Sequence, residues 1–107
     1  MNSTLFRPLI VPAKTVVLLV FVPSSVTQQD SVNQLLGQVG TVLGDRIRIT
    51  RVDQVIHPEV VRSFGVHQLP SFILLKQGIE IWRHNGLMES RELIRTLSVQ
   101  LPEEGKE

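Results

Sequence analysis

The chain has 107 residues, which is the size of one domain with a single hydrophobic core. Hydrophobic residues make up 42% and charged residues 20%, so the composition excludes an intrinsically disordered chain. The formal net charge of +1 argues against a nucleic-acid-binding protein, which needs a concentrated basic surface. Cysteine is absent, so this chain's own residues cannot form a disulfide, a thiolate nucleophile, a zinc–thiolate centre or an iron–sulfur cluster. We expect no cofactor.

The longest strongly apolar run covers residues 16–22, about a third of the roughly 20 residues that a membrane-spanning helix needs. We therefore expect no membrane partner. A secretion signal is the alternative, because Arg7 and Lys14 precede the run. The run is short for such a signal and rich in β-branched residues, which favours a buried strand and a cytoplasmic protein.

The first half of the chain predicts a strand, a helix and a second strand. Residues 1–14 hold two prolines and predict an irregular arm or one short helix. Residues 16–22 are continuously apolar, as in a strand that is covered on both faces of a parallel sheet. Apolar residues recur at helical spacing from about 29 to 43, and residues 46–52 alternate as a strand. This order predicts a parallel crossover connection.

The predicted helix has one apolar stripe, formed by Val32, Leu35, Leu36, Val39, Val42 and Leu43. Gly37 and Gly40 lie inside it, and each costs about 1 kcal/mol relative to Ala. We interpret the two glycines as a sign that the helix is bent or closely approached by a neighbour.

The second half predicts a short helix, a hairpin and a final helix. Pro58 suits a first helical residue, and Gly65 suits the left-handed position that follows a helix. Residues 71–76 and 79–84 predict strands joined by a tight turn at Gln77–Gly78. A last amphipathic helix follows Gly86, on the spacing of Leu93, Ile94, Leu97 and Leu101, and residues 102–107 form a polar tail.

Several segments in register resemble a thioredoxin. They are residues 52–53, 57–60, 64–78 and 80–87, together with Leu18–Pro23, which resembles the strand that leads to the thioredoxin active site. The similarity covers about residues 16–101 and implies an α/β, thioredoxin-like fold: a mixed sheet flanked by helices, in a single domain over residues 1–107. The family's first strand has no clear counterpart, so we expect four strands rather than five.

The resemblance also shows where the family's chemistry is missing. The two cysteines of the thioredoxin motif fall on Ser25 and Gln28, within one residue, and the preceding aromatic residue falls on Ser24. Serine cannot form a disulfide, and an amide cannot act as the resolving thiol. The family's buried Asp falls on Leu19, or on Val20 if the register slips. The chain therefore lacks the residues of the dithiol reaction.

The basic residue that accompanies this Asp in the family matches Arg51, which the alternation of residues 47–52 directs inward with Ile47 and Ile49. A buried guanidinium needs a partner. We expect Arg51 to reach water, to bond to Gln28 or Gln29, or to pair with Asp53, and we favour Asp53.

The other wall of the family's active site is retained. Leu69–Pro70 matches the cis-proline loop, whose backbone pairs in relatives with an extended substrate segment, and Gly86–Leu87 matches the neighbouring glycine loop. Val22, Val26, Val66, Leu69 and Leu87 would border a shallow apolar groove. The predicted binding residues are Ser24, Ser25, Val26, Gln28, Leu69, Pro70, Gly86 and Leu87.

Other candidate sites have simpler explanations. Ser25 with His67 could be a nucleophile and a base, but a helix cap from Ser24, Ser25 or Thr27 is favoured because no acid orients the imidazole. The remaining histidines, His57 and His84, are too far apart in sequence for a metal motif. Arg46 and Arg48 predict a solvated strand edge, and Trp82 predicts sheet packing rather than a binding platform.

We expect a redox-inactive, thioredoxin-like binding module and not an enzyme. Its partner would be a protein or an extended peptide segment held at the Pro70 loop, a retained feature beside missing cysteines. Two alternatives stay open: a homodimer that buries the same groove, and thioredoxin-type activity that depends on an external thiol.

Overall fold

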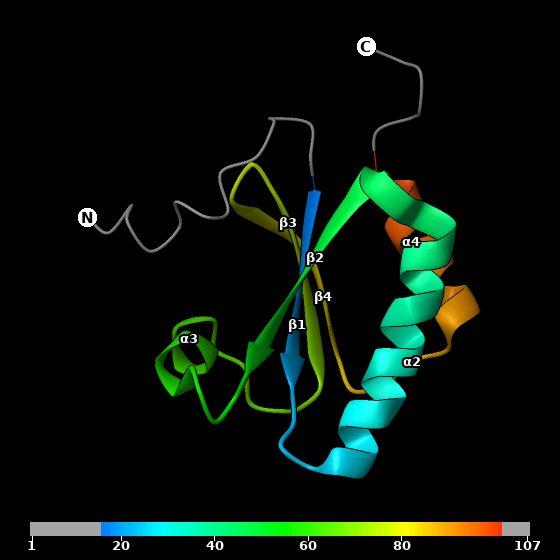
Figure 1. The fold of residues 1–107 in the computed structure, drawn as a ribbon. Helices are drawn as coiled ribbons and strands as arrows, with labels where there is room; N and C mark the ends of the chain where they lie inside the picture. The colour runs from blue at the N-terminus through cyan, green and yellow to red at the C-terminus, as the bar shows by residue number, and fades with distance from the viewer. Residues whose placement is uncertain (1–15, 102–107) are drawn as a thin grey trace.

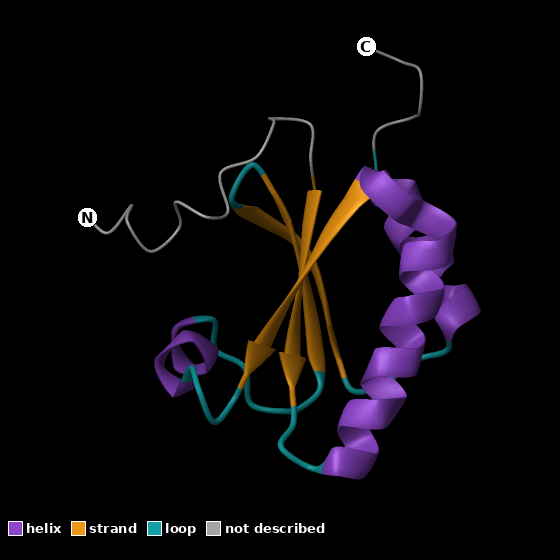
Figure 2. Ribbon diagram, viewed as in Figure 1, coloured by secondary structure: helices purple, strands orange, loops and turns teal. Residues whose placement is uncertain are grey.

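The computed structural model describes residues 16–101, so the predicted arm (1–14) and polar tail (102–107) lie outside the described residues. Within the described range, α-helices flank one mixed four-stranded sheet (Figures 1 and 2). The elements are β1 (Val16–Val22), α2 (Val26–Leu43), the 3-10 turn η2 (Gly44–Arg46), β2 (Ile47–Asp53), α3 (Pro58–Ser63), β3 (Ser71–Lys76), β4 (Ile79–Asn85) and α4 (Ser90–Gln100).

The sheet has the order β2-β1-β3-β4. β1 pairs in parallel with β2, which confirms the predicted crossover through α2, and it pairs antiparallel with β3 on its other side. β3 and β4 then form an antiparallel hairpin. Every residue of β1 is buried, as its continuous apolar sequence predicts. The four-stranded mixed sheet expected from the sequence is confirmed for the described residues.

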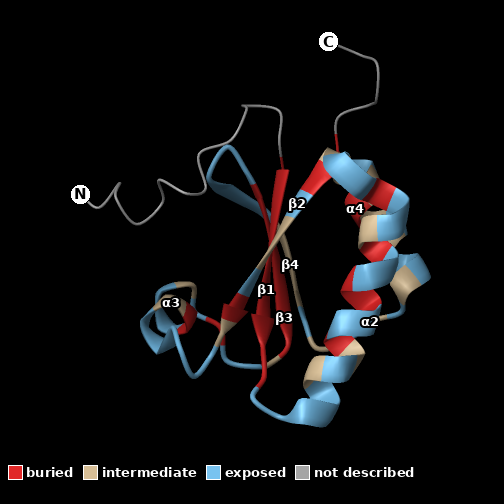
Figure 3. Cartoon of the chain, viewed as in Figure 1, coloured by how far each residue is buried: buried red, intermediate tan, exposed pale blue. Residues whose placement is uncertain are grey.

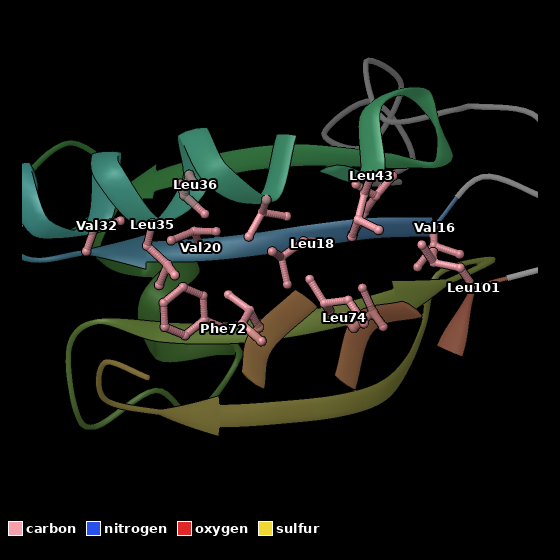
Figure 4. Packing of buried hydrophobic residues seen from close by; sticks show 14 of the residues in the cluster. Val16, Leu18, Val20, Val32, Leu35, Leu36, Leu43, Phe72, Leu74 and Leu101 are labelled. Carbon is pink, nitrogen blue, oxygen red and sulfur yellow. The ribbon is translucent and has the colours of Figure 1, made fainter. Parts of the chain in front are cut away.

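Each face of the sheet carries its own core. α2 and α4 cover one face, where their apolar side chains pack on alternate residues of β1 and β3, including Leu18, Val20, Phe72 and Leu74 (Figures 3 and 4). α3 covers the other face, where Val61 joins a smaller cluster with residues of the opposite alternation. Burying each such side chain contributes about 1.5–3 kcal/mol, so both layers hold the sheet in place.

The turns follow the predicted chemistry. Gln77 and Gly78 both have positive φ, 53° and 81°, as a type I′ hairpin turn requires. Pro58 occupies the start of α3, and Gly65, with φ of 66°, follows its end.

Helix α2 differs from the prediction in three respects. It begins at Val26 rather than near Gln29, because no residue of its first turn is buried and the apolar stripe that reveals the rest starts only at Val32. Val42 is 60% exposed, since the buried stripe passes from Val39 to Leu43 four residues later and leaves Val42 beside it. A Cβ built on Gly37 or Gly40 meets nothing within 4 Å, so the predicted close approach is wrong.

No helix among residues 16–101 combines the length and the apolar character that crossing a membrane requires.

Candidate functional site

The predicted binding residues all lie at one end of the sheet. β1, β2 and β4 end there and β3 begins there, because Val22 is paired with Asp53 and Ser71 with both Phe21 and Asn85. In Figure 1 this is the lower end, where β1 leads into α2. We call it the Pro70 end, and it contains Ser24, Ser25, Val26, Gln28, Leu69, Pro70, Gly86 and Leu87.

Polar side chains bond to the main chain at the start of α2, where the resemblance to thioredoxins would place the two cysteines. Ser25 is the N-cap, with φ −67° and ψ 129°, and its Oγ accepts a hydrogen bond of 3.4 Å from the main-chain N–H of Gln28. Gln29 Nε2 donates to the carbonyl of Pro23 at 2.9 Å, which fixes the turn between β1 and α2. The cap prediction is confirmed for Ser25, and no hydrogen bond among the described residues joins its hydroxyl to His67.

The Pro70 loop is held against the end of β4. The Leu69–Pro70 peptide bond is cis. The N–H of Gly86 donates to the Pro70 carbonyl at 2.7 Å. The fully buried Ser71 hydroxyl has two acceptors within hydrogen-bond distance, the Gln68 carbonyl and Oδ1 of Asn85 at 2.9 Å, and its single proton is donated to one of them at a time. These contacts connect both sides of the loop to the strand that ends at Asn85.

Gly86 occupies a position that suits glycine for two reasons. Its φ is 92°, a backbone conformation that residues with a Cβ rarely adopt. A Cβ added there would lie 3.2 Å from Nε2 of Gln68, so the Gln68 side chain would have to move. The glycine thus allows the two loops to approach each other.

Leu69 keeps its main-chain groups available. Neither its N–H nor its carbonyl makes a hydrogen bond to any residue within 16–101. Its side chain is half-buried and packs on the smaller core, which fixes the direction of the backbone. An unpaired donor and acceptor in an ordered loop can pair with an extended segment.

Exposed apolar side chains surround this loop unevenly. Val26 is 72% exposed and Leu87 is 50% exposed, whereas Val22 and Val66 are buried. The predicted contribution of these two valines to an exposed border is therefore wrong, because they complete the cores beneath the surface.

Sequence reasoning missed Val55 and Ile56, which follow β2 at the same end and are 69% and 67% exposed. Asp53 Oδ1 accepts hydrogen bonds from the N–H groups of Val55 (2.7 Å) and Ile56 (3.2 Å), which folds the segment into a turn and leaves both side chains outside the core. The sequence signal that could have revealed them is two adjacent apolar residues in the loop between a strand and Pro58.

Arg51 lies on the predicted face of β2, since its register partner Val20 and the alternating Ile47 belong to the larger core, but its favoured pairing with Asp53 is wrong. The Arg51 side chain is exposed on the edge strand β2, so it reaches water, which is one of the three expected outcomes. The Asp53 carboxylate is engaged by main-chain amides instead. Leu19 is buried in the smaller core, and the register places Arg51 beside Val20. Because the guanidinium is exposed, no buried charge at this position needs a partner.

The only ion pair among the described residues lies within β4, and its arginine also bonds to the residue that follows α3. Arg83 Nε and Nη2 lie 2.7 and 2.9 Å from the two carboxylate oxygens of Glu80, and Nη2 also donates to the Phe64 carbonyl at 2.9 Å. The hydrogen bond from Arg83 lowers the pKa of the Glu80 carboxyl, and the same contact raises the pKa of Arg83.

The remaining candidates do not form a reactive site. No group of His, Asp and Glu within residues 16–101 is arranged to hold a metal ion. Trp82 is partly buried against the larger core, in line with the predicted sheet packing, and its ring stacks on His84 at a centroid distance of 6.2 Å. Arg48 is exposed on the edge strand, as expected.

Comparison with known proteins gives one consistent set of relatives. No protein-family model matches the chain. A thioredoxin-like protein from Synechocystis sp. is 31% identical over 65 residues, which are 61% of this chain and 62% of that protein. Thioredoxin Y1, chloroplastic, from Arabidopsis thaliana is 28% identical over 67 residues, or 63% of this chain and 39% of that protein.

Among solved structures, a thioredoxin-2 described as a component of the malaria parasite protein secretion machinery superposes with a TM-score of 0.75 at 26% identity. The match covers 79% of this chain and 82% of that one. A second malarial protein gives a TM-score of 0.74 at 26% identity, covering 82% and 99%. The chain thus spans less than two thirds of the curated relatives named above, but most of the length of the superposed structures.

Proposed function

This chain is a thioredoxin-like protein that encodes no cysteine, and we propose that it is a redox-inactive binding module which holds an extended segment of a partner protein at its Pro70 end. Dithiol exchange needs a thiolate nucleophile and a second, resolving thiol. The positions that would carry them hold Ser25, which caps a helix, and Gln28.

The observation that carries the proposal is that the main-chain groups of Leu69 are unpaired within residues 16–101. Its N–H and carbonyl have no hydrogen-bond partner among the described residues, while the loop around it is held in place by the bond between Gly86 and Pro70. An extended peptide that runs past Leu69 can bond to both groups. The pairing resembles strand addition, except that the peptide pairs with a loop and not with an edge strand. Because the loop is already ordered, the partner alone loses conformational entropy on binding.

Side chains around the loop indicate what the partner segment looks like. Val26 and Leu87 expose apolar surface at the Pro70 end, and Val55 and Ile56 expose more after β2, the edge strand opposite β4. We infer a segment with small or apolar side chains at alternate positions, because successive side chains of an extended peptide point to opposite sides. Specificity would then come from the apolar contacts and affinity from the main-chain bonds.

The test is capture of partner segments from a displayed library of short peptides, followed by titration of the best binders by NMR. Leu87→Asp should weaken binding at least roughly tenfold by placing a charge on the apolar surface. Ile79→Asp is the matched control, since Ile79 is similarly exposed at the opposite end of β4 and pairs with Lys76. Equal binding by parent and Leu87→Asp would reject the proposal.

Two other functions make distinct predictions. A homodimer that buries the Pro70 end would show concentration-dependent sedimentation that Leu87→Asp abolishes. Activity with an external thiol would show disulfide reduction above the thiol alone. The exposed apolar residues at this end of the sheet fit peptide binding and dimer burial equally, whereas the free main-chain groups of Leu69 favour a peptide.

The cytoplasmic location stays a prediction. Its support is that the run which could resemble a secretion signal, Val16–Val22, forms the fully buried β1, paired with strands on both sides. The plant relatives are named as chloroplastic, so microscopy of the tagged chain in its own cell is the measurement that decides the compartment.

A further inference from the structure

Asn85 and Gly86 form an Asn–Gly dipeptide at the end of β4, and Asn85 is exposed to solvent. This dipeptide is the most favourable sequence for spontaneous deamidation, because glycine has no side chain to hinder the approach of its own nitrogen to the asparagine. Nothing in the binding function described above uses this chemistry.

The reaction needs no cofactor and no oxidant. A solvent base removes the proton of the Gly86 N–H, and the nitrogen attacks Cγ of Asn85 to form a new C–N bond. The bond from Cγ to the side-chain nitrogen breaks, and ammonia leaves after taking a proton from solvent. Water then opens the five-membered imide at either carbonyl and produces aspartate or isoaspartate at position 85.

Contacts in the folded chain oppose each part of this attack. The N–H of Gly86 is donated to the Pro70 carbonyl at 2.7 Å, so its proton is less available to a base. The side-chain amide of Asn85 lies with Oδ1 at 2.9 Å from the buried Ser71 hydroxyl, which restrains the rotation that would bring Cγ to the nitrogen. The hydrogen-bonded register of β3 with β4, which pairs Ser71 with Asn85, restrains the backbone between them.

We propose that Asn85 is a deamidation site which the folded chain keeps closed through Ser71 and Pro70, and which opens when the Pro70 loop separates from β4. Each opening that leads to reaction changes the chain irreversibly, since both products carry a new carboxylate at position 85, two residues before Leu87. Isoaspartate also lengthens the main chain by one methylene at the point where the Gly86–Pro70 bond is made. This inference does not depend on the proposed binding function.

The test follows deamidation of the purified chain in mildly alkaline buffer. Trypsin releases residues 84–91, between Arg83 and Arg91, and mass spectrometry of this peptide reports replacement of the amide by a carboxyl. The folded parent should react at least roughly tenfold more slowly than the synthetic 84–91 peptide, because only transiently opened molecules react. Ser71→Ala should react faster than the parent. Asn33, an exposed asparagine within α2 that precedes Gln34, is the internal control and should stay unmodified.

Four results bear on the proposal. Equal rates in the folded parent and the free peptide would overturn it, as would an unreactive free peptide. A folded Ser71→Ala protein that deamidates at the parent rate would show that Ser71 does not protect Asn85, and it would overturn the proposal. If Ser71→Ala does not fold, the parent in a urea series decides: a rate that rises with the unfolded fraction supports the proposal, and a constant rate overturns it.

Discussion

The main-chain N–H of Gly86 donates a hydrogen bond of 2.7 Å to the carbonyl of Pro70, and this bond joins the loop before β3 to the loop after β4. The two residues lie on opposite sides of the hairpin, whose strands pair Ser71 with Asn85. The main-chain geometry of the candidate binding surface therefore depends on one hydrogen bond and on the glycine that permits it.

Gly86→Ala should destabilise the chain by about 1–2 kcal/mol, because Ala is forced into positive φ and its Cβ lies against the Gln68 side chain. Urea denaturation followed by circular dichroism measures the change. Gly78→Ala is the matched control, since Gly78 also has positive φ but a Cβ there meets nothing within 4 Å. A smaller loss in Gly86→Ala than in Gly78→Ala would contradict the proposed contact.

Gly37→Ala should have the opposite sign and stabilise the chain by about 0.5–1 kcal/mol. Gly37 lies within α2, where Ala has the higher helix propensity and a Cβ has open space. The same denaturation experiment measures it, and the main-chain carbonyl that accepts from Thr41 Oγ1 is retained. A destabilised Gly37→Ala variant would mean that a neighbour does approach the helix there.

Ser25→Ala should cost about 0.5–1 kcal/mol, at the lower end for an N-cap because its bond to the Gln28 N–H is long at 3.4 Å. Ser24→Ala is the control. Ser24 does not provide the cap hydrogen bond, so this variant should unfold at the parent's urea midpoint. Equal losses in the two variants would show that Ser25 stabilises α2 by some route other than its hydroxyl.

The Glu80–Arg83 pair should make stability depend on pH. The hydrogen bond from Arg83 holds the folded pKa of Glu80 below the ordinary value of 4.5 for glutamate, so the pair stabilises the folded chain above that value and the contribution is lost as pH falls through the folded pKa. Glu80→Gln should therefore lower the urea midpoint at neutral pH and leave it unchanged in acid. The difference should be small because both side chains are well exposed.

Arg83→Ala should cost more than Glu80→Gln at neutral pH, since Arg83 also donates to the Phe64 carbonyl and so connects β4 to the end of α3. Equal costs would assign the whole effect to the ion pair.

Ser25→Cys with Gln28→Cys should give weak but measurable reduction of insulin disulfides, which we do not expect of the parent because it has no cysteine. The two positions belong to the cap and first turn of α2, where exposed N–H groups favour a thiolate. Activity should stay low because the resemblance places the family's buried acid on Leu19 or Val20, both of which are buried apolar residues here. Ser25→Cys alone is the control, since a single thiol has no resolving partner. An inactive double variant that folds and forms its disulfide would contradict the inferred shape of this end.

The sequence predicted the strands and turns well because their signals are local. The apolar run of β1 and the Gln77–Gly78 turn each have one physical explanation, and both were confirmed. Errors arose where a neighbour decides the outcome. Alternation gave the face of Arg51 but could not show that its side chain is exposed on an edge strand, and helical spacing could not show that Val42 falls beside the contact with the sheet. The exposed Val55–Ile56 pair was missed because its orientation depends on a turn made by the Asp53 side chain.

The placement of β1 has a consequence for how the chain acquires its fold. Both partners of Val16–Val22 lie later in the sequence, at residues 47–53 and 71–76, so this central strand cannot complete its pairing during the early part of synthesis. Until then it presents seven consecutive apolar, mostly β-branched residues, a composition typical of self-association between nascent chains. Chaperone dependence and yield on overexpression should therefore respond more to this segment than to any surface residue.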